Sequence, residues 1–137
     1  MIIVDTGPLV AIANDRDQQH NACLSLLGRY RGPVLVPAPV VVEVCQLLAG
    51  RRGARSEALF LTSLADGVLE LLDLRPADYG RAAELVQKYA DLPLGAVDAC
   101  VIAAAERMGA TEIATLDHRH FSVVRPKHTP AFTLLPS

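Results

Sequence analysis

The chain opens with an apolar run that stops at a carboxylate. Residues 1–4 read Met-Ile-Ile-Val, and Asp5 follows them directly, ahead of a Thr-Gly-Pro turn signal. A short, fully apolar run of this kind is typical of a strand that is buried on both faces of a parallel sheet. Because ligands bind in open α/β sheets beyond the carboxyl ends of the strands, the pattern predicts that Asp5 lies at an edge where a site can form.

The rest of the chain is divided by Gly and Pro into short elements. Strands are predicted over residues 2–5, 34–36, 68–72, 113–116 and 132–135. Helices are predicted over residues 8–14, 18–29, 39–49, 55–64, 77–89 and 95–108. Strands that alternate with helices predict an α/β fold in which a mostly parallel sheet is covered on both faces.

The segment from residue 39 to residue 49 carries opposing signals. Its β-branched run over residues 40–44 favours a strand. Pro37 and Pro39, however, interrupt a continuous strand, and Pro39 suits the first turn of a helix, where its missing N–H costs little. The following Gln-Leu-Leu-Ala also favours a helix, so we predict a helix here, ending near Gly50.

Length and composition predict one domain over residues 1–137, with an aliphatic core. The chain is 51% hydrophobic but only 4% aromatic. No apolar run approaches the roughly 20 residues that a membrane span needs, and the start lacks the basic leader of a signal peptide. The three cysteines show no zinc-site spacing. These features predict a cytoplasmic protein that has no membrane association.

The net charge of −2 argues against passive binding of a polyanion by the whole surface. It is compatible with a nuclease whose charges are segregated, with acids in the site and basic residues around it. The candidates for such a basic rim are Arg51, Arg52, Arg55, Arg119, Arg125 and Lys127.

Three further acids share the apolar setting of Asp5. Glu43, Asp98 and Asp117 lie in the segments VVVEVC, LGAVDACV and EIATLD, respectively. A carboxylate in an apolar setting is costly unless it is paired or binds a metal. On the helix predicted over residues 95–108, Asp98 continues the core-facing stripe in the first turn, where the helix dipole favours an anion. Four such acids in a small chain therefore suggest one shared cation site.

Carboxylates that are brought together raise one another's pKa unless a cation compensates. Mg²⁺ or Mn²⁺ is the natural partner, because these ions take oxygen ligands and accept phosphate oxygens as well. Thr6 and Thr115 flank the acids, and their hydroxyls are candidates to hold water or a phosphate oxygen at the ion.

Taken together, these segments resemble the PIN-domain ribonucleases, and in particular the VapC-type toxins of toxin–antitoxin pairs. The resemblance rests on IVDT at the start, the acid-bearing helix around Glu43, and the segments LGAVDA and ATLD. It extends over nearly the whole chain, through residues 121–125 and 132–135. It implies a three-layer α/β/α sandwich and an Mg²⁺- or Mn²⁺-dependent endoribonuclease.

The resemblance also implies roles and partners. Asp5, Glu43, Asp98 and Asp117 match the acids that bind metal, and Thr6 and Thr115 match hydroxyl positions of the same catalytic site. Asp117 matches the most variable of these acids, which often acts through water. The implied partners are an RNA substrate, a second copy in a homodimer, and a VapB-like antitoxin. The tail of the antitoxin would cover the acidic pocket, where an Arg or Lys could compete with the metal.

Other interpretations of the same residues stay open at this stage. Asp117 could simply cap a following turn, and His118, His120 and His128 are interpreted as solvated loop residues. A PIN-domain nuclease that processes housekeeping RNA without an antitoxin is the nearest alternative function. A phosphoacceptor receiver-like signalling domain, which also carries acids at strand ends, is an alternative from a different class, although Lys127 is poorly placed for its lysine. A non-enzymatic interaction module is a third possibility.

Overall fold

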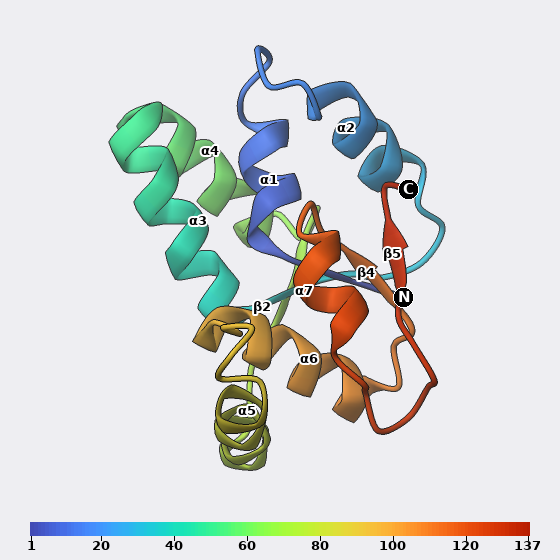
Figure 1. Ribbon diagram of the computed structural model, residues 1–137. Helices are drawn as coiled ribbons and strands as arrows, with labels where there is room; N and C mark the ends of the chain where they lie inside the picture. Colours follow the sequence, from blue (N-terminus) through green and yellow to red (C-terminus); the bar gives the residue numbers. More distant parts are fainter.

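A five-stranded sheet runs through the middle of the protein (Figure 1), and the computed structural model describes all of residues 1–137. Its strands are β1 (Ile2–Val4), β2 (Val34–Pro37), β3 (Glu70–Leu72), β4 (Glu112–Ala114) and β5 (Thr133–Leu135). The spatial order is β3-β2-β1-β4-β5, and every neighbouring pair is parallel. All five strands therefore end at the same edge of the sheet, with β1 in the centre.

Seven helices pack around the sheet. They are α1 (Thr6–Ile12), α2 (His20–Arg29), α3 (Ala38–Arg51), α4 (Ala54–Ala65), α5 (Pro76–Lys88), α6 (Ala96–Met108) and α7 (His118–Val123). In Figure 1, α5 and α6 lie below the strands, and α1, α2 and α4 lie above them. The helices thus cover both faces of the sheet, which confirms the predicted three-layer α/β/α sandwich.

The core is aliphatic, as the composition predicts. All three residues of β1 are fully buried, because both faces of the central strand are covered. In α3, the stripe Val40, Val44 and Leu48 is fully buried at helical spacing. The helix α6 is buried along residues 99–105, so it lies deepest of the seven. None of the helices is both long enough and apolar enough to span a membrane.

Several predicted boundaries are wrong, and one helix was not predicted. The Thr-Gly-Pro segment forms no turn, because α1 begins at Thr6 with Asp5 in extended conformation as its N-cap. The helix prediction for residues 39–49 is confirmed by α3, which is slightly longer. The strand predicted over residues 113–116 ends at Ala114. Beyond it lies α7, whose six residues are too few to show a helical period in the sequence.

A buried ion pair locks α5 to α6. Asp78 is 4% exposed, and its two carboxylate oxygens accept hydrogen bonds from Nε of Arg107 at 3.1 and 2.8 Å. The same carboxylate accepts the backbone N–H of Arg75 at 2.9 Å, which caps the start of α5. Arg107 also donates to the carbonyl of Asp73 at 2.9 Å. These bonds hold the outer helix against the helix that carries Asp98.

We expect Arg107→Met to lower the free energy of unfolding by about 2 kcal/mol, because it leaves the buried Asp78 carboxylate without its counter-charge. Urea denaturation measures this change. Glu84→Ala is the matched control, since Glu84 is 65% exposed in its pair with Arg81 and should change stability by less than about 0.5 kcal/mol. An equal decrease in the free energy of unfolding in both variants would show that the Asp78–Arg107 pair stabilises the protein no more than an exposed ion pair does.

Candidate metal centre

The register of β1 and β4 brings the first and last acids of the chain to one place. Val4 pairs with Ala114, and the backbone N–H of Asp5 donates to the carbonyl of Ala114 at 2.9 Å. Asp5 and Thr115 are therefore the first residues beyond two neighbouring strands. This is the edge at which the sequence pattern placed Asp5, and it is where α/β sheets hold their ligands.

Thr115 connects two of the acids. It is fully buried, and its hydroxyl donates to Oδ2 of Asp5 at 2.9 Å. The hydroxyl oxygen of Thr115 in turn accepts the backbone N–H of Asp117 at 3.0 Å. The sequence suggested that this hydroxyl holds water or phosphate, but in the structure it holds Asp5 and Asp117 in fixed positions. Its bond to Asp5 joins residues that are 110 positions apart, which no local sequence pattern can reveal.

Two helices supply the other acids. Asp98 lies in the first turn of α6, where the backbone N–H of the N-cap residue Gly95 lowers the pKa of its carboxyl. Glu43 lies in α3, on the partly buried side of the helix next to the Val40–Val44 stripe. The negative charge of Glu43 raises the pKa of both Asp5 and Asp98. The four predicted acids therefore act on one another as a single electrostatic cluster.

The raised pKa of Asp5 shows that ionisation of this carboxyl group is unfavourable in the cluster. The pKa of Asp5 is raised to about 6, mainly by burial and also by the charges of Asp98 and Glu43, while hydrogen bonds from Thr6 and Thr115 lower it. Burial also raises the pKa of Asp98, assisted by Asp117 and Glu43, while His120 lowers it. Two acids that resist ionisation at one edge are the electrostatic signature of a site that needs added positive charge.

The helix α7 brings a histidine into the cluster. Asp117 is the N-cap of α7, and its Oδ1 accepts the backbone N–H of His120 at 3.1 Å. The imidazole Nδ1 of His120 lies 2.6 Å from Oδ2 of Asp117 and 3.8 Å from Oδ2 of Asp98. The interpretation of His120 as a solvated loop residue is therefore wrong, whereas His118 and His128 are exposed. The one available signal was the Asp-x-x-His spacing, which is that of a cap and its third residue.

Close packing beside the cluster depends on Gly7. A Cβ atom on Gly7 would lie 3.3 Å from Cβ and Cγ of Leu116, which is tighter than most contacts of this kind. The absence of a side chain therefore lets the first turn of α1 approach the segment between β4 and α7. This approach brings Asp5 and Thr6 to the same place as Thr115 and Asp117.

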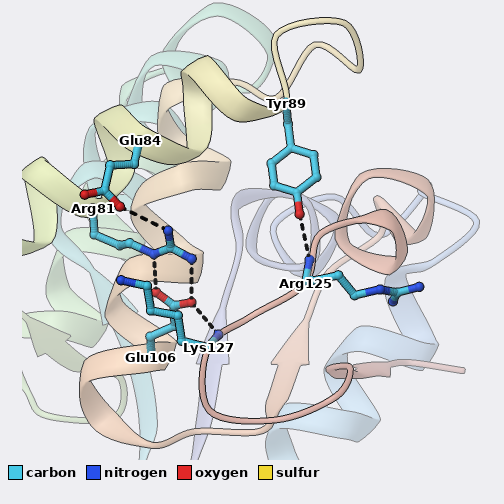
Figure 2. A network of polar contacts seen from close by, with 6 residues as sticks. All are labelled: Arg81, Glu84, Tyr89, Glu106, Arg125 and Lys127. Atoms are coloured by element: carbon cyan, nitrogen blue, oxygen red, sulfur yellow. Dashed lines mark hydrogen bonds and ion pairs between the residues drawn. The ribbon is translucent and has the colours of Figure 1, made fainter.

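Two hydrogen bonds fix the segment that follows α7 (Figure 2). The hydroxyl of Tyr89 accepts the backbone N–H of Arg125 at 3.0 Å, and Oε2 of Glu106 accepts the backbone N–H of Lys127 at 2.8 Å. Arg81 holds that Glu106 through two hydrogen bonds of 2.7 and 3.0 Å. The side chain of Arg125 extends away from Tyr89. The C-terminal end of α7 is thereby tied to α5 and α6.

The residues present fit a divalent cation. Asp98, Asp117 and His120 offer ligand atoms that all lie within 4.8 Å of one another. Next to Asp5, the hydroxyl of Thr6 is buried and has no hydrogen-bond partner. Carboxylate oxygens are the ligands that hard divalent ions prefer, and a cation would relieve the raised pKa of Asp5 and Asp98. The structure thus brings all six predicted site residues to one edge of the sheet, with His120 in addition.

Comparison with known proteins agrees with this architecture. Residues 2–126 match the family model for the PIN domain. The chain is 35% identical over 135 residues to the ribonuclease VapC26 of Mycobacterium tuberculosis strain ATCC 25618 / H37Rv, a match that covers 98% of this chain and all of that protein.

Solved structures share the fold. The crystal structure of Mycobacterium tuberculosis VapC20, a Sarcin-Ricin loop cleaving toxin, superposes with a TM-score of 0.78 at 22% identity, covering 82% of this chain and 87% of that one. For VapBC2 from Rickettsia felis, bound to a promoter DNA fragment, the TM-score is 0.68 at 18% identity, with 98% and 97% covered. For FitAcB from Neisseria gonorrhoeae, it is 0.63 at 17% identity, with 84% and 86% covered. With its acids gathered at the carboxyl edge of a parallel sheet, this chain belongs to the PIN domain family, among the relatives of the VapC ribonucleases.

Proposed function

We propose that this chain is a metal-dependent endoribonuclease that acts as the toxin of a toxin–antitoxin pair. The observation that carries the proposal is the convergence of Asp5, Glu43, Asp98 and Asp117 in one electrostatic cluster at the carboxyl edge of the sheet. The 35% identity to a VapC ribonuclease over nearly the full chain supports the reaction class and the toxin role.

In this proposal, Asp5, Asp98, Glu43 and Asp117 hold one or two divalent ions, which we assign as Mg²⁺ or Mn²⁺. Such an ion supplies, when bound, the positive charge that activates water and stabilises the charge that develops on a phosphodiester. We assign the buried Thr6 hydroxyl, which has no hydrogen-bond partner, as a donor to a phosphate oxygen bound beside Asp5. Thr115 keeps the Asp5 carboxylate and the Asp117 backbone in position. The expected products carry 5′-phosphate and 3′-hydroxyl ends.

The proposed RNA substrate is negatively charged, and the acidic cluster that it would approach is negatively charged as well. The six basic residues predicted to form a rim are all exposed, so they are available to bind phosphates. Of these, Arg119 lies in α7 next to His120, and Arg125 extends from the segment that follows α7 (Figure 2). Basic side chains around an acidic centre would hold the RNA backbone by charge while the acids keep their ion.

Incubation of purified protein with total RNA, with and without Mg²⁺ or Mn²⁺, tests this function. We expect discrete cleavage that EDTA abolishes, and sequencing of the ends should give 5′-phosphates. Cleavage that persists in EDTA, or that leaves cyclic phosphate ends, would point to a metal-independent mechanism instead.

The antitoxin has a candidate docking surface above the sheet. A groove of about 480 Å³ lies between α1, α2 and α4, and ten of its thirteen lining residues are hydrophobic. Three of its apolar side chains are unusually exposed for a lone chain, namely Leu24 at 49%, Leu59 at 61% and Val68 at 74%. The helix α1 lines this groove and begins beside Asp5, and its seven residues span about 10 Å. A segment seated in the groove could therefore extend its tail to the acids.

We expect Leu59→Asp to weaken binding of the VapB-like partner at least roughly tenfold, because it places a charge in the apolar groove. Loss of growth rescue when toxin variant and partner are co-expressed gives the readout. Leu61→Asp is the matched control, since Leu61 is exposed on the same helix but lies outside the groove. Equal rescue of both variants would place the antitoxin elsewhere.

The strand order argues against the receiver-like alternative. Receiver domains have the flavodoxin-like order 2-1-3-4-5, whereas this sheet has the order β3-β2-β1-β4-β5.

A housekeeping PIN nuclease without an antitoxin remains the second candidate within the family, and growth arrest on expression of this chain alone distinguishes the two. The homodimer stays a prediction.

A further inference from the structure

His120 places a buried ring nitrogen inside the acidic cluster, within ion-pair distance of two carboxylates. Its Nδ1 is buried and makes no aligned hydrogen bond, although Oδ2 of Asp117 is only 2.6 Å away. A second open polar group lies at the same edge, because the hydroxyl of Thr6 is buried next to Asp5 and also lacks a partner. Buried polar atoms in native proteins are nearly always paired, so the Thr6 hydroxyl and the poorly aligned Nδ1 of His120 both point to a ligand at this edge.

We propose that Nδ1 of His120 is a ligand of the divalent ion, together with Asp98 and Asp117, and that it gives the site a preference for Mn²⁺ over Mg²⁺. The proposal deepens the metal-dependent function proposed above and rests on it. The acids alone would make an all-oxygen site, which is the expectation that the sequence supports. The imidazole changes the chemical character of the donor set.

The separations between the three donors suit one ion. Adjacent ligands of an octahedral ion with bonds of about 2.1 Å lie about 3 Å apart, and opposite ligands about 4.2 Å. Nδ1 of His120 is 2.6 Å from one carboxylate oxygen and 3.8 Å from the other, and the largest separation within the set is below 4.8 Å. The separations between the three donors are therefore close to those between ligands of one ion.

The nitrogen is held in position by the fold. The cap at Asp117 fixes the first turn of α7, and Phe121, which follows His120, is buried with 1% exposure. Beyond the helix, Tyr89 and Glu106 hold the backbone of Arg125 and Lys127 (Figure 2). These contacts, on α7 and on the segment after it, keep the orientation of the helix, so the imidazole lies close to Asp98 before any ion arrives.

A nitrogen donor affects the two candidate ions differently. Mg²⁺ strongly prefers oxygen ligands, whereas imidazole is a good ligand for transition-metal ions. Mn²⁺ is the softer of the two, so it tolerates the mixed set of carboxylate and imidazole better. Replacement of His120 by Gln supplies an amide oxygen in place of the nitrogen, so it should reduce the affinity for Mn²⁺ more than the affinity for Mg²⁺.

Pulsed electron paramagnetic resonance on the Mn²⁺-loaded full chain tests the ligand directly, without any measurement of activity. We expect modulation from a directly bound ¹⁴N nucleus, and its replacement by a ¹⁵N signal in protein that carries ¹⁵N-labelled histidine. His120→Ala and His120→Gln should both lose the signal. His128→Ala is the control that keeps it, because Nε2 of His128 bonds to the carbonyl of Ala110, away from the acids.

Titration calorimetry with Mn²⁺ and with Mg²⁺ completes the test. In His120→Gln we expect the affinity for Mn²⁺ to fall roughly tenfold, while the affinity for Mg²⁺ changes by less than about twofold. Bound Mn²⁺ without a nitrogen signal, or a signal that persists in His120→Ala, would overturn the ligand assignment and leave the proposed nuclease standing. Failure of the wild-type chain to bind Mn²⁺ at all would overturn both proposals.

Discussion

Asp5→Asn is expected to reduce RNA cleavage by about a hundredfold or more, because it removes a negatively charged oxygen that we propose as a metal ligand. Asn keeps the size of the side chain and can still accept the hydrogen bond from Thr115, so the fold should be unchanged. Cleavage of a defined RNA in Mn²⁺, alongside circular dichroism, measures both. Undiminished cleavage would reject the site assignment.

The same variant should be more stable than the wild type when metal is absent. The Asp5 pKa of about 6 lies above the ordinary value of 3.8 for an aspartate, so the folded state binds the proton more tightly than the unfolded state does. Stability of the metal-free wild type therefore falls as pH rises from 3.8 to about 6, and the full cost remains above that range. A pKa shift of this size corresponds to a loss of about 3 kcal/mol in the stability of the metal-free wild type. The variant should recover less than this, because the amide of Asn makes weaker hydrogen bonds than the carboxylate.

Thermal unfolding in EDTA at a series of pH values measures this effect. We expect Asp5→Asn to unfold at a higher temperature than the wild type at pH 7.5, and the difference to disappear near pH 4. Addition of Mn²⁺ should then stabilise the wild type more than the variant, since the wild type carries one more buried negative charge for the ion to neutralise. A variant that is less stable than the wild type at every pH would show that the ionised Asp5 carboxylate does not destabilise the metal-free protein.

Thr115→Val is expected to lower cleavage by roughly tenfold to a hundredfold, although Thr115 need not touch the substrate. Valine has the same shape but lacks the hydroxyl, so Asp5 loses a donor and the backbone N–H of Asp117 loses its acceptor. The hydrogen bond from Thr115 lowers the pKa of Asp5. Its loss should therefore move that pKa above 6 and shift the acid limb of the activity profile to higher pH.

Carboxyl NMR of metal-free protein measures the Asp5 pKa, and the pH dependence of cleavage measures the consequence. Thr115→Ser is the control, because it retains the hydroxyl and should keep both properties close to those of the wild type. If Val and Ser variants behaved alike, the effect would come from lost packing of the methyl group rather than from the bridge between the two acids.

The features of this site that the sequence predicted are those that depend on short stretches of consecutive residues. The apolar run before Asp5 predicted a buried central strand, and the helix around Asp98 was predicted from its stripe and from Gly109 at its end. These signals need only a few consecutive residues, because strand burial and helix periodicity are local properties. The metal-binding role of the acids remains a proposal.

The parts that were not predicted depend on contacts across the chain. The bridge from Thr115 to Asp5 exists only because β4 pairs with β1. The helix α7 is too short for its pattern to show, so His120 was interpreted as a solvated residue. Asp117 was weighed as either a fourth site acid or a simple cap. In the structure its Oδ1 caps α7 while its Oδ2 faces His120, so the two interpretations are compatible.

Insertion of β4 between β1 and β5 delays assembly of the acidic cluster during synthesis of the chain. A nascent polypeptide that ends before residue 112 contains Asp5 and Glu43. It lacks β4, the strand that pairs with β1 and is followed by Thr115 and Asp117. Ribosome-bound fragments of this length therefore lack a complete centre. Under the proposed function, the growing chain gains RNA cleavage only after β4 and α7 have been synthesised.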